Sequence, residues 1–151
     1  MTTKKTTAVP VIGRTDALDF PAWQLTDVRA KIDTGAYTSS IHCTQIKLLK
    51  DSKLSFYLPA QKGNKKQRFV TDEFELKNVK NSFGQAELRY VVKTQVVLFG
   101  TTIKAEFSLA DRTSMRYPVL LGRKFLRNRF LVDVSLENLS LQQKNGRFTK
   151  T

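Results

Sequence analysis

Alternation of apolar and polar residues is the dominant pattern of this chain, and long stretches with a helical period are missing from it. The clearest example runs from Ile103 to Leu109, where apolar residues alternate with Lys104, Glu106 and Ser108. Successive side chains of a strand point to opposite faces, so this segment has one core face and one solvent face. The sequence therefore predicts an all-β protein.

The other predicted elements follow from the same pattern and from turn residues. The segment Leu88–Phe99 is rich in valine and tyrosine, and Gly100-Thr101 supplies a turn, so we predict a long hairpin with the strand that follows. Further strands are predicted at Leu25–Ile32, Tyr37–Leu48, Arg68–Leu76 and Phe130–Val134, one short helix at Arg123–Arg129, and loops at Gln61–Lys66 and Asn78–Gly84.

The length of the chain fits one domain. It has 151 residues and a mass of 17.2 kDa, enough to bury a core without disulfides or a structural metal. We expect a flexible tail over residues 1–10, one domain over residues 11–141 and a basic tail over residues 142–151. Its longest apolar runs are too short for a secretory signal or a membrane span, so we expect a cytoplasmic protein with no membrane partner.

The charge of the chain points to anionic partners. Lysine and arginine number 26 against 13 acidic residues, which gives a formal net charge of +13. Such a field attracts nucleic acid, ribosomal surfaces and acidic peptides alike, and net charge alone does not rank them. Most of the phenylalanines alternate with polar residues and so belong to the core rather than to a base-stacking surface.

The tripeptide Asp33-Thr34-Gly35 stands at the end of a predicted strand. Aspartic peptidases activate a water between two carboxylates, one ionised and one protonated, because like charges about 3 Å apart do not both ionise. Asp33 would supply one carboxylate, while Gly35 permits a tight turn and Thr34 offers a hydroxyl to tie two such turns together. The same tripeptide also forms ordinary turns, so by itself it leaves both interpretations open.

A second motif, Tyr117-Pro118-Val119-Leu120-Leu121-Gly122-Arg123, makes the aspartic interpretation more specific. With Asp33-Thr34-Gly35-Ala36, it resembles the retropepsins, the single-lobed aspartic peptidases that include retroviral proteases. The resemblance implies a closed β-barrel with a flap hairpin, one short helix and a ψ loop formed by Leu121, Gly122 and Arg123. It also implies that the segment Val79–Gly84 closes over substrate.

The closer resemblance, over roughly residues 11–135, is to a bacterial retropepsin-like group often labelled ATP-dependent zinc proteases. It rests on three segments, which are Ala30–Ala36, Thr38–His42 and Met115–Arg123. We assign Asp33, Thr34 and Gly35 as catalytic. As substrate-binding residues we assign Lys31, Ala36, Asn81, Ser82, Phe83, Gly84 and Leu120.

The zinc and ATP in that label find no support in the residues. The chain has one histidine, one cysteine, no HExxH motif and no GxxxxGK[ST] loop, so we expect no metal and no cofactor. His42 and Cys43 are neighbours that would face opposite sides of a strand, and we expect both to be structural.

One Asp-Thr-Gly motif provides one carboxylate, whereas the mechanism needs two. We therefore expect a homodimer in which the two Asp33 side chains meet at the twofold axis. Asp72, Asp111 and Asp133 are not followed by Thr-Gly or Ser-Gly, so we interpret them as turn or surface acids.

Two positions depart from the retroviral pattern. Retroviral enzymes have an aspartate after Asp-Thr-Gly-Ala that pairs with the arginine of the Gly-Arg element, and here that position is Tyr37. Arg123 then either fixes the ψ loop through another partner or faces substrate, and we favour the structural role. Lys31 replaces an apolar residue and either lines the cleft together with Asp33 or lies on the surface. Arg29 and Arg89 would extend a basic lining.

The sequence thus predicts a dimeric aspartic endopeptidase with a preference for acid-rich peptides. The resembled group is associated with ligases that add glutamate to protein tails, which makes a glutamate-tailed protein one candidate substrate. The alternative is a noncatalytic basic β domain that binds RNA or a ribosomal protein.

Overall fold

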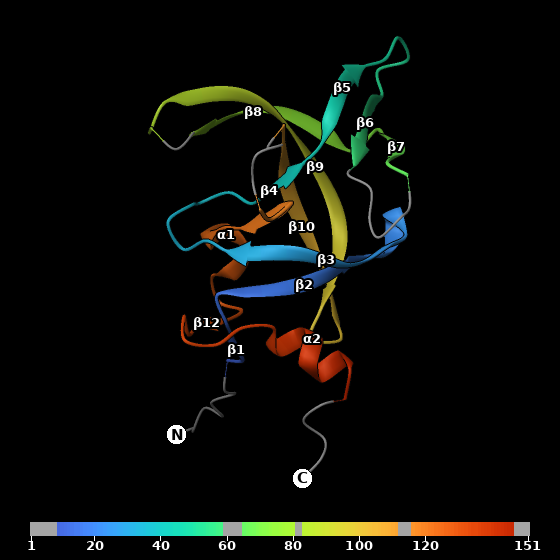
Figure 1. The fold of residues 1–151 in the computed structure, drawn as a ribbon. Helices are drawn as coiled ribbons and strands as arrows, with labels where there is room; N and C mark the ends of the chain where they lie inside the picture. The colour runs from blue at the N-terminus through green and yellow to red at the C-terminus, as the bar shows by residue number, and fades with distance from the viewer. Residues whose placement is uncertain (1–8, 59–64, 81–82, 112–115, 147–151) are drawn as a thin grey trace, which may run out of the picture.

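The computed structural model describes residues 9–58, 65–80, 83–111 and 116–146, and strands dominate it (Figure 1). The elements are β1 (Val11–Ile12), β2 (Thr15–Phe20), the 3-10 helix η1 (Pro21–Trp23), β3 (Leu25–Ile32), β4 (Ser40–His42), β5 (Thr44–Leu48), β6 (Leu54–Leu58), β7 (Gln67–Thr71), β8 (Phe74–Lys80), β9 (Ala86–Leu98), β10 (Thr101–Ala110), β11 (Val119–Leu121), α1 (Arg123–Leu126), β12 (Leu131–Val132) and α2 (Leu139–Lys144).

The main sheet has seven strands in the order β10-β4-β11-β3-β2-β9-β8. Because β9 also pairs with β10, all of these strands except β8 form a closed ring of pairings. A smaller antiparallel sheet holds β5, β6 and β7, and β1 pairs with β12 in parallel. The structure confirms the predicted all-β fold class.

Aromatic side chains join the three-stranded sheet to the ring. Trp23 stacks on Phe20 with ring centroids 5.2 Å apart, and it contacts Phe56 of β6 edge-on and Phe69 of β7 at a tilt, both at 5.8 Å. Phe20, Phe56 and Phe107 are fully buried. Burial of each such side chain stabilises the fold by about 1.5–3 kcal/mol, so this cluster fixes β6 and its neighbours over the end of the ring.

The predicted hairpin between β9 and β10 is confirmed. Its strands run antiparallel from Leu98↔Thr101 to Val91↔Ser108. The two turn residues, Phe99 and Gly100, have φ angles of 53° and 70°. A two-residue hairpin turn with both φ angles positive matches the natural twist of the strands, and glycine adopts that geometry without steric cost.

Several predicted boundaries are wrong. Arg68–Leu76 contains two strands, β7 and β8, because a turn at Asp72-Glu73 interrupts it; the Thr71 hydroxyl accepts a hydrogen bond from the Glu73 N–H at 3.0 Å. Residues 78–80, expected in a loop, continue β8 because they pair with residues 86–88 of β9. In Tyr37–Leu48, strand structure starts only at residue 40 and breaks at residue 43.

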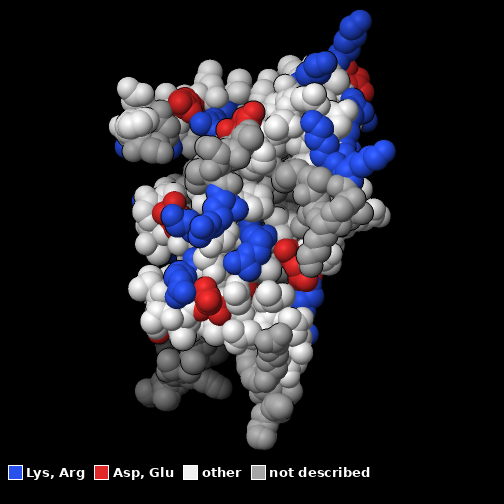
Figure 2. Space-filling view, viewed as in Figure 1, with Lys and Arg blue, Asp and Glu red and all other residues white. Residues whose placement is uncertain are grey.

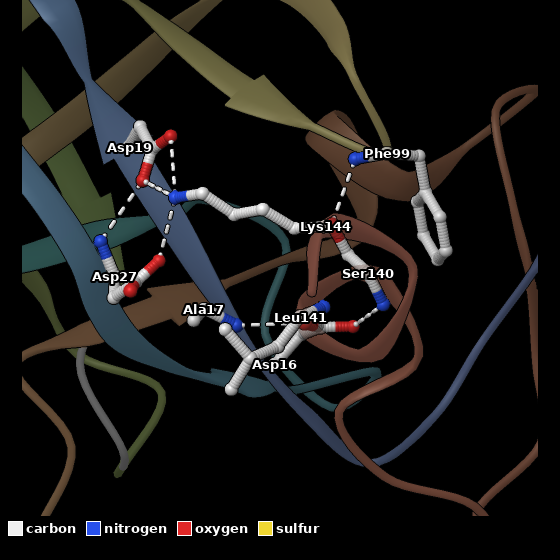
Figure 3. A network of polar contacts seen from close by, with 8 residues as sticks. All are labelled: Asp16, Ala17, Asp19, Asp27, Phe99, Ser140, Leu141 and Lys144. Atoms are coloured by element: carbon white, nitrogen blue, oxygen red, sulfur yellow. Dashed lines mark hydrogen bonds and ion pairs between the residues drawn. The ribbon is translucent and has the colours of Figure 1, made fainter. Parts of the chain in front are cut away.

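The described residues contain two short α-helices where the sequence predicts one. The extra helix, α2, crosses the boundary predicted after residue 141. Its first turn lies against Asp16 of β2, whose carboxylate accepts hydrogen bonds from the N–H groups of Ser140 at 2.8 Å and Leu141 at 3.1 Å (Figure 3). Burial raises the pKa of the Asp16 carboxyl, and these N–H donors oppose that shift.

A second contact holds the end of α2. The Lys144 ammonium donates to the Asp19 carboxylate at 2.9 Å and to the Asp27 carboxylate at 2.7 Å (Figure 3). The helix therefore covers the outer side of β2, which explains why that strand is buried on both faces and shows no alternation.

Parts of the predicted tails and loops lie outside the described residues, namely residues 1–8, most of the loop at residues 61–66, and residues 147–151. Among the residues that the structure describes, no helix has the length and apolar character needed to cross a membrane.

Candidate active site

Asp33 follows the last residue of β3, at the start of a tight turn. Its Oδ1 accepts a hydrogen bond from the Gly35 N–H at 3.0 Å, and its carbonyl accepts one from the Ala36 N–H at 3.2 Å. The side chain is half-buried, while Thr34 and Gly35 are exposed. The turn thus presents a carboxylate held by the backbone at the surface of one chain.

Strand β11 lies between β3 and β4, although the chain runs directly from β3 to β4. It pairs parallel with β3 through Leu120↔Lys31 and antiparallel with β4 through Leu120↔Ser40. The Asp33 N–H continues this ladder by donating to the Leu121 carbonyl at 2.9 Å. This is the ψ arrangement that the resemblance implies, and it fixes the backbone at the start of the Asp33-Thr34-Gly35 turn.

Gly122, directly after β11, packs against the loop that follows Asp33. Its N–H donates to the Ser39 hydroxyl at 3.0 Å. A Cβ on this residue would lie 2.7 Å from the carbonyl oxygens of Tyr37 and Thr38. Backbone atoms do not yield as a flexible side chain does, so this position accepts only glycine.

Arg123 contacts the loop that carries Asp33 at two points. Its Nη1 donates to the Thr34 carbonyl at 3.1 Å, and its guanidinium lies over the Tyr37 ring at 5.7 Å from the centroid. Its backbone N–H donates to the Ala36 carbonyl at 2.8 Å. Tyr37 thus occupies the position of the missing aspartate and gives the guanidinium an aromatic face instead of a carboxylate.

The remaining predicted residues near the turn differ in exposure. Lys31 is exposed, whereas its register partner Leu120 is buried within the chain. Arg29, on the same exposed side of β3, lies over the Tyr117 ring at 5.7 Å. Figure 2 shows lysine and arginine side chains over the face that carries β2 and β3 in Figure 1.

The predicted flap corresponds to the tip of the β8–β9 hairpin. Phe83 is 87% exposed there and Gly84 follows it with a φ angle of 80°. Asn81 and Ser82 lie outside the described residues.

A cavity of about 590 Å³ lies between this hairpin and α1. Figure 1 shows β8 above α1 in this view. Part of its lining comes from Tyr37, Thr38 and Ser39, which lie in the loop after the Asp33-Thr34-Gly35 turn. The charged side chains that line it are Lys77, Lys93, Lys104, Glu106, Lys124 and Arg129. Sequence reasoning missed this cavity and assigned Lys104 and Glu106 only to a solvent face.

Glu106 is the one acidic residue in that lining. Its Oε1 accepts hydrogen bonds from Lys124 at 3.0 Å and from Lys77 at 3.4 Å. Burial alone would raise the pKa of the Glu106 carboxyl, but the two ammonium groups outweigh burial and lower it. The carboxylate therefore stays ionised and holds two lysines from different elements together.

The other acids and the single thiol have structural surroundings. Asp133 accepts hydrogen bonds from the N–H and hydroxyl of Ser135, at 2.9 and 2.6 Å, and Asp111 lies 3.9 Å from His42. Cys43 is fully buried, and burial raises the pKa of its thiol to about 12. In the described ranges, no three histidine, cysteine, aspartate or glutamate side chains gather as metal ligands would.

Comparison with protein families tests the interpretation of these motifs. Residues 11–143 match the family model named RimB-like, which is described as the retropepsin-like aspartic endopeptidase RimB. The chain belongs to this family. The match spans the Asp33-Thr34-Gly35 turn, the ψ arrangement and most of α2.

Curated relatives of this RimB-like chain carry a different name. A protein of Shewanella halifaxensis named probable alpha-L-glutamate ligase is 36% identical over 140 residues, which is 89% of this chain and 30% of that protein. A protein of Desulfotalea psychrophila with the same name is 30% identical over 86% of this chain and 29% of its own length. The chain thus spans about a third of these relatives.

The fold also occurs in a solved structure. A crystal structure of a Legionella pneumophila protein of unknown function superposes with a TM-score of 0.70 and 24% identity, covering 87% of this chain and 98% of that one. At this level of sequence identity, the structural similarity shows that the RimB-like chain and the Legionella protein share a fold, and no more than that.

Proposed function

We propose that this RimB-like chain is an aspartic endopeptidase that acts as a homodimer. The observation that carries the proposal is the Asp33-Thr34-Gly35 turn, which β11 supports where the Leu121 carbonyl accepts a hydrogen bond from the Asp33 N–H. A water-activating dyad requires a half-buried carboxylate from each subunit. A backbone N–H must hold that carboxylate, and the residues beside it must be exposed.

The reaction uses two Asp33 carboxylates that share one proton. The ionised carboxylate takes a proton from a water, and that water attacks the scissile carbonyl carbon. The protonated carboxylate donates to the carbonyl oxygen, so a tetrahedral diol forms. Collapse of the diol breaks the C–N bond as the amide nitrogen gains a proton. Because the reaction needs one carboxylate protonated and the other ionised, we expect an acid-side pH optimum.

The need for a second chain follows from the number of catalytic turns. Asp33 is the only aspartate of this chain followed by Thr-Gly. Thr34 and Gly35 are exposed in the single chain, which leaves them available to the same turn of a second copy. In an isologous contact each subunit offers the same surface, so the two carboxylates meet at the axis.

Acid-rich peptides or glutamate-tailed proteins are the proposed substrates. The net charge of +13 attracts anionic chains, and the exposed Lys31 precedes the catalytic turn. The relatives named probable alpha-L-glutamate ligase carry a region similar to this chain, which supports a substrate that contains added glutamate.

The direct test is cleavage of an acid-rich peptide library from pH 3 to 8 by wild type and by Asp33→Asn. We expect the substitution to abolish cleavage, because the amide neither accepts a proton from water nor holds the shared proton. Asp72→Asn changes an exposed acid in the β7–β8 turn and serves as the matched control. Cleavage that survives Asp33→Asn, or that a chelator abolishes, contradicts the aspartic mechanism.

Mixing experiments test the dimer separately. An excess of Asp33→Asn chain added to wild type should reduce activity by forming mixed dimers with one carboxylate. Sedimentation velocity should show a chain-concentration-dependent equilibrium whose dimer fraction tracks activity. Full activity at concentrations where only monomer sediments would refute the homodimer.

A further inference from the structure

The small sheet of β5, β6 and β7 is more basic than the rest of the chain. Residues 44–71, which run from the start of β5 to the end of β7, contain seven lysine and arginine residues but one acid, Asp51, whereas the whole chain has 26 against 13. Figure 2 shows lysine and arginine side chains gathered over the part of the molecule that carries these strands in Figure 1. The cavity beside α1 has no described residue of this range in its lining, so it does not account for their charge.

The two faces of this sheet differ in their side chains. Phe56 of β6 and its register partner Phe69 of β7 point toward the ring of strands, where both contact Trp23. Because successive side chains of a strand point to opposite faces, Tyr57 and its register partner Arg68 point to the outer face. The sheet thus turns one aromatic ring and one guanidinium away from the core.

Three further side chains belong to the outer face. Lys47 of β5 and Val70 of β7 are both register partners of Ser55, which shares its orientation with Tyr57 two positions later in β6. Lys47 is exposed, and Val70 is 44% exposed. Lys66, directly before β7, places its ammonium 5.4 Å from the centroid of the Tyr57 ring. The outer face therefore combines cations, a tyrosine ring and an exposed apolar side chain.

The cations of the outer face are available to an incoming anion. Within the residues that the structure describes, no carboxylate lies within ion-pair distance of Lys47, Lys66 or Arg68. Tyr57 is only half-buried, and the ammonium above its ring sits on a long flexible chain. A phosphate can therefore pair with these cations without displacing an acid, and a base can take the place of Lys66 on the ring.

The tyrosine ring favours single-stranded RNA over other anions. A basic surface that holds an aromatic side chain binds single strands by pairing with phosphates and stacking an unpaired base. An acidic peptide would use the cations and leave the ring without a role, and a duplex offers no unstacked base. Unpaired bases of this kind are presented by the loops, bulges and ends of RNA.

We infer that the outer face of β5, β6 and β7 binds single-stranded RNA. Lys47 and Arg68 pair with phosphates, and Tyr57 stacks on a base. This function goes beyond the proposed peptidase activity and does not depend on it. It would let the chain hold an RNA or a protein–RNA particle through one surface while the Asp33 turn stays open to a peptide.

Fluorescence anisotropy with a labelled, unstructured RNA of about 12 nucleotides tests the phosphate contacts. We expect the double variant Lys47→Gln/Arg68→Gln to raise Kd by about fivefold or more. The slope of log Kd against log salt concentration should fall by about 1.4, since each phosphate contact to a single strand contributes about 0.7. The matched control Lys80→Gln/Arg127→Gln removes one exposed lysine and one exposed arginine elsewhere and should change Kd by less than about twofold.

The tyrosine is tested by a pair of variants. Tyr57→Phe keeps the ring and should leave Kd within about twofold of wild type, whereas Tyr57→Leu should raise Kd by about fivefold or more. Thermal unfolding of each variant checks that it is folded. The glutamine variants change exposed side chains only, so they decide the inference even where Tyr57→Leu does not fold.

Four results would overturn the inference. Equal effects of the two double variants would mean that binding follows net charge alone. Tighter binding of duplex RNA, or of a single DNA strand of the same sequence, would assign the face to another nucleic acid. Tighter binding of a peptide of eight glutamates, weakened by Lys47→Gln/Arg68→Gln, would assign it to an acidic protein. Slower cleavage of a short neutral peptide by that variant than by the control would place the face in the peptidase site.

Discussion

The Arg123 guanidinium donates a hydrogen bond to the backbone carbonyl of Thr34 at 3.1 Å, which ties the start of α1 to the middle of the Asp33-Thr34-Gly35 turn. The same guanidinium lies over the Tyr37 ring, on the far side of that turn. Arg123 thus spans the loop that carries Asp33 without using a carboxylate.

Loss of the contact between Arg123 and Thr34 should reduce peptidase activity more than it reduces the stability of the fold. We expect Arg123→Ala to lower the free energy of unfolding by on the order of 1 kcal/mol, since the side chain is exposed, and to lower kcat/KM by about tenfold because Asp33 loses its fixed position. Arg123→Lys keeps the charge but not the planar group, so its stability and activity should lie between those of wild type and of Arg123→Ala. Urea unfolding and peptide cleavage check this, with Arg127→Ala, exposed at the end of α1, as the control. Equal activity of both alanine variants would contradict it.

Gly122 should tolerate no side chain. A Cβ would meet the Tyr37 and Thr38 carbonyl oxygens at 2.7 Å, so Gly122→Ala forces β11 away from the loop. We expect a loss of about 1–3 kcal/mol or more in unfolding free energy and loss of the Ser39 hydrogen bond. Thr102→Ala, exposed on β10, should change stability by less than about 0.5 kcal/mol. A Gly122→Ala chain as stable as wild type would mean that the loop moves freely.

The stability of α2 should depend on Asp16, whose carboxylate accepts hydrogen bonds from the first turn of the helix. Asp16→Asn replaces one acceptor oxygen by an NH₂ group that faces N–H donors, and we expect it to cost about 1–3 kcal/mol of unfolding free energy. Lys144→Met removes only the partly exposed contacts with Asp19 and Asp27 and should cost less than about 1 kcal/mol. Hydrogen exchange of the Ser140 and Leu141 amides reports the local effect. Unchanged protection in Asp16→Asn would refute the capping role.

The Cys43 thiol should make stability fall at high pH. Burial raises its pKa from 9.0 to about 12, so between these values the folded chain keeps a proton that the unfolded chain loses. Unfolding is then favoured as pH rises, by at most about 1.4 kcal/mol per pH unit. Cys43→Ala lacks this slope, so the stability difference between the two chains should shrink between pH 9 and 11 in urea titrations.

Thiol labelling provides an independent check. An aromatic disulfide reagent at pH 8.5 should modify Cys43 only at the rate at which the chain unfolds, because the sulfur is fully buried. Rapid labelling of the folded chain would show that the thiol is accessible, and the pH slope should then vanish as well.

Much of the fold class could be predicted because its signal is local. The alternation in Ile103–Leu109 and the Gly100 turn each depend on neighbours within a few residues, and β3 has the predicted bounds Leu25–Ile32. The residues of the Asp33-Thr34-Gly35 turn and of the Gly-Arg element could be listed from motifs, since each motif is a short stretch of chain. The contacts between the two motifs, through Leu121, Ser39 and Thr34, could not be predicted from those short stretches.

Elements without alternation were missed for a physical reason. Strand β2 is buried on both faces, and the six residues of α2 are too few to show a period of 3.6. The helix takes its cap from Asp16, which lies 124 positions earlier in the sequence than Ser140. A contact across that separation leaves no local pattern.

The sequence by itself determined the β class, the position of the Asp33 turn and the basic character of the chain, because composition and short-range periodicity express these directly. Tertiary structure decided which charges lie together: packing of β8, β9, β10 and α1 brings Lys77 and Lys124 into contact with Glu106, and places Lys93 and Lys104 in the lining of the same cavity. Side chains far apart in the chain become neighbours only when the ring of strands closes and buries its apolar face, and that closure is a property of the whole fold.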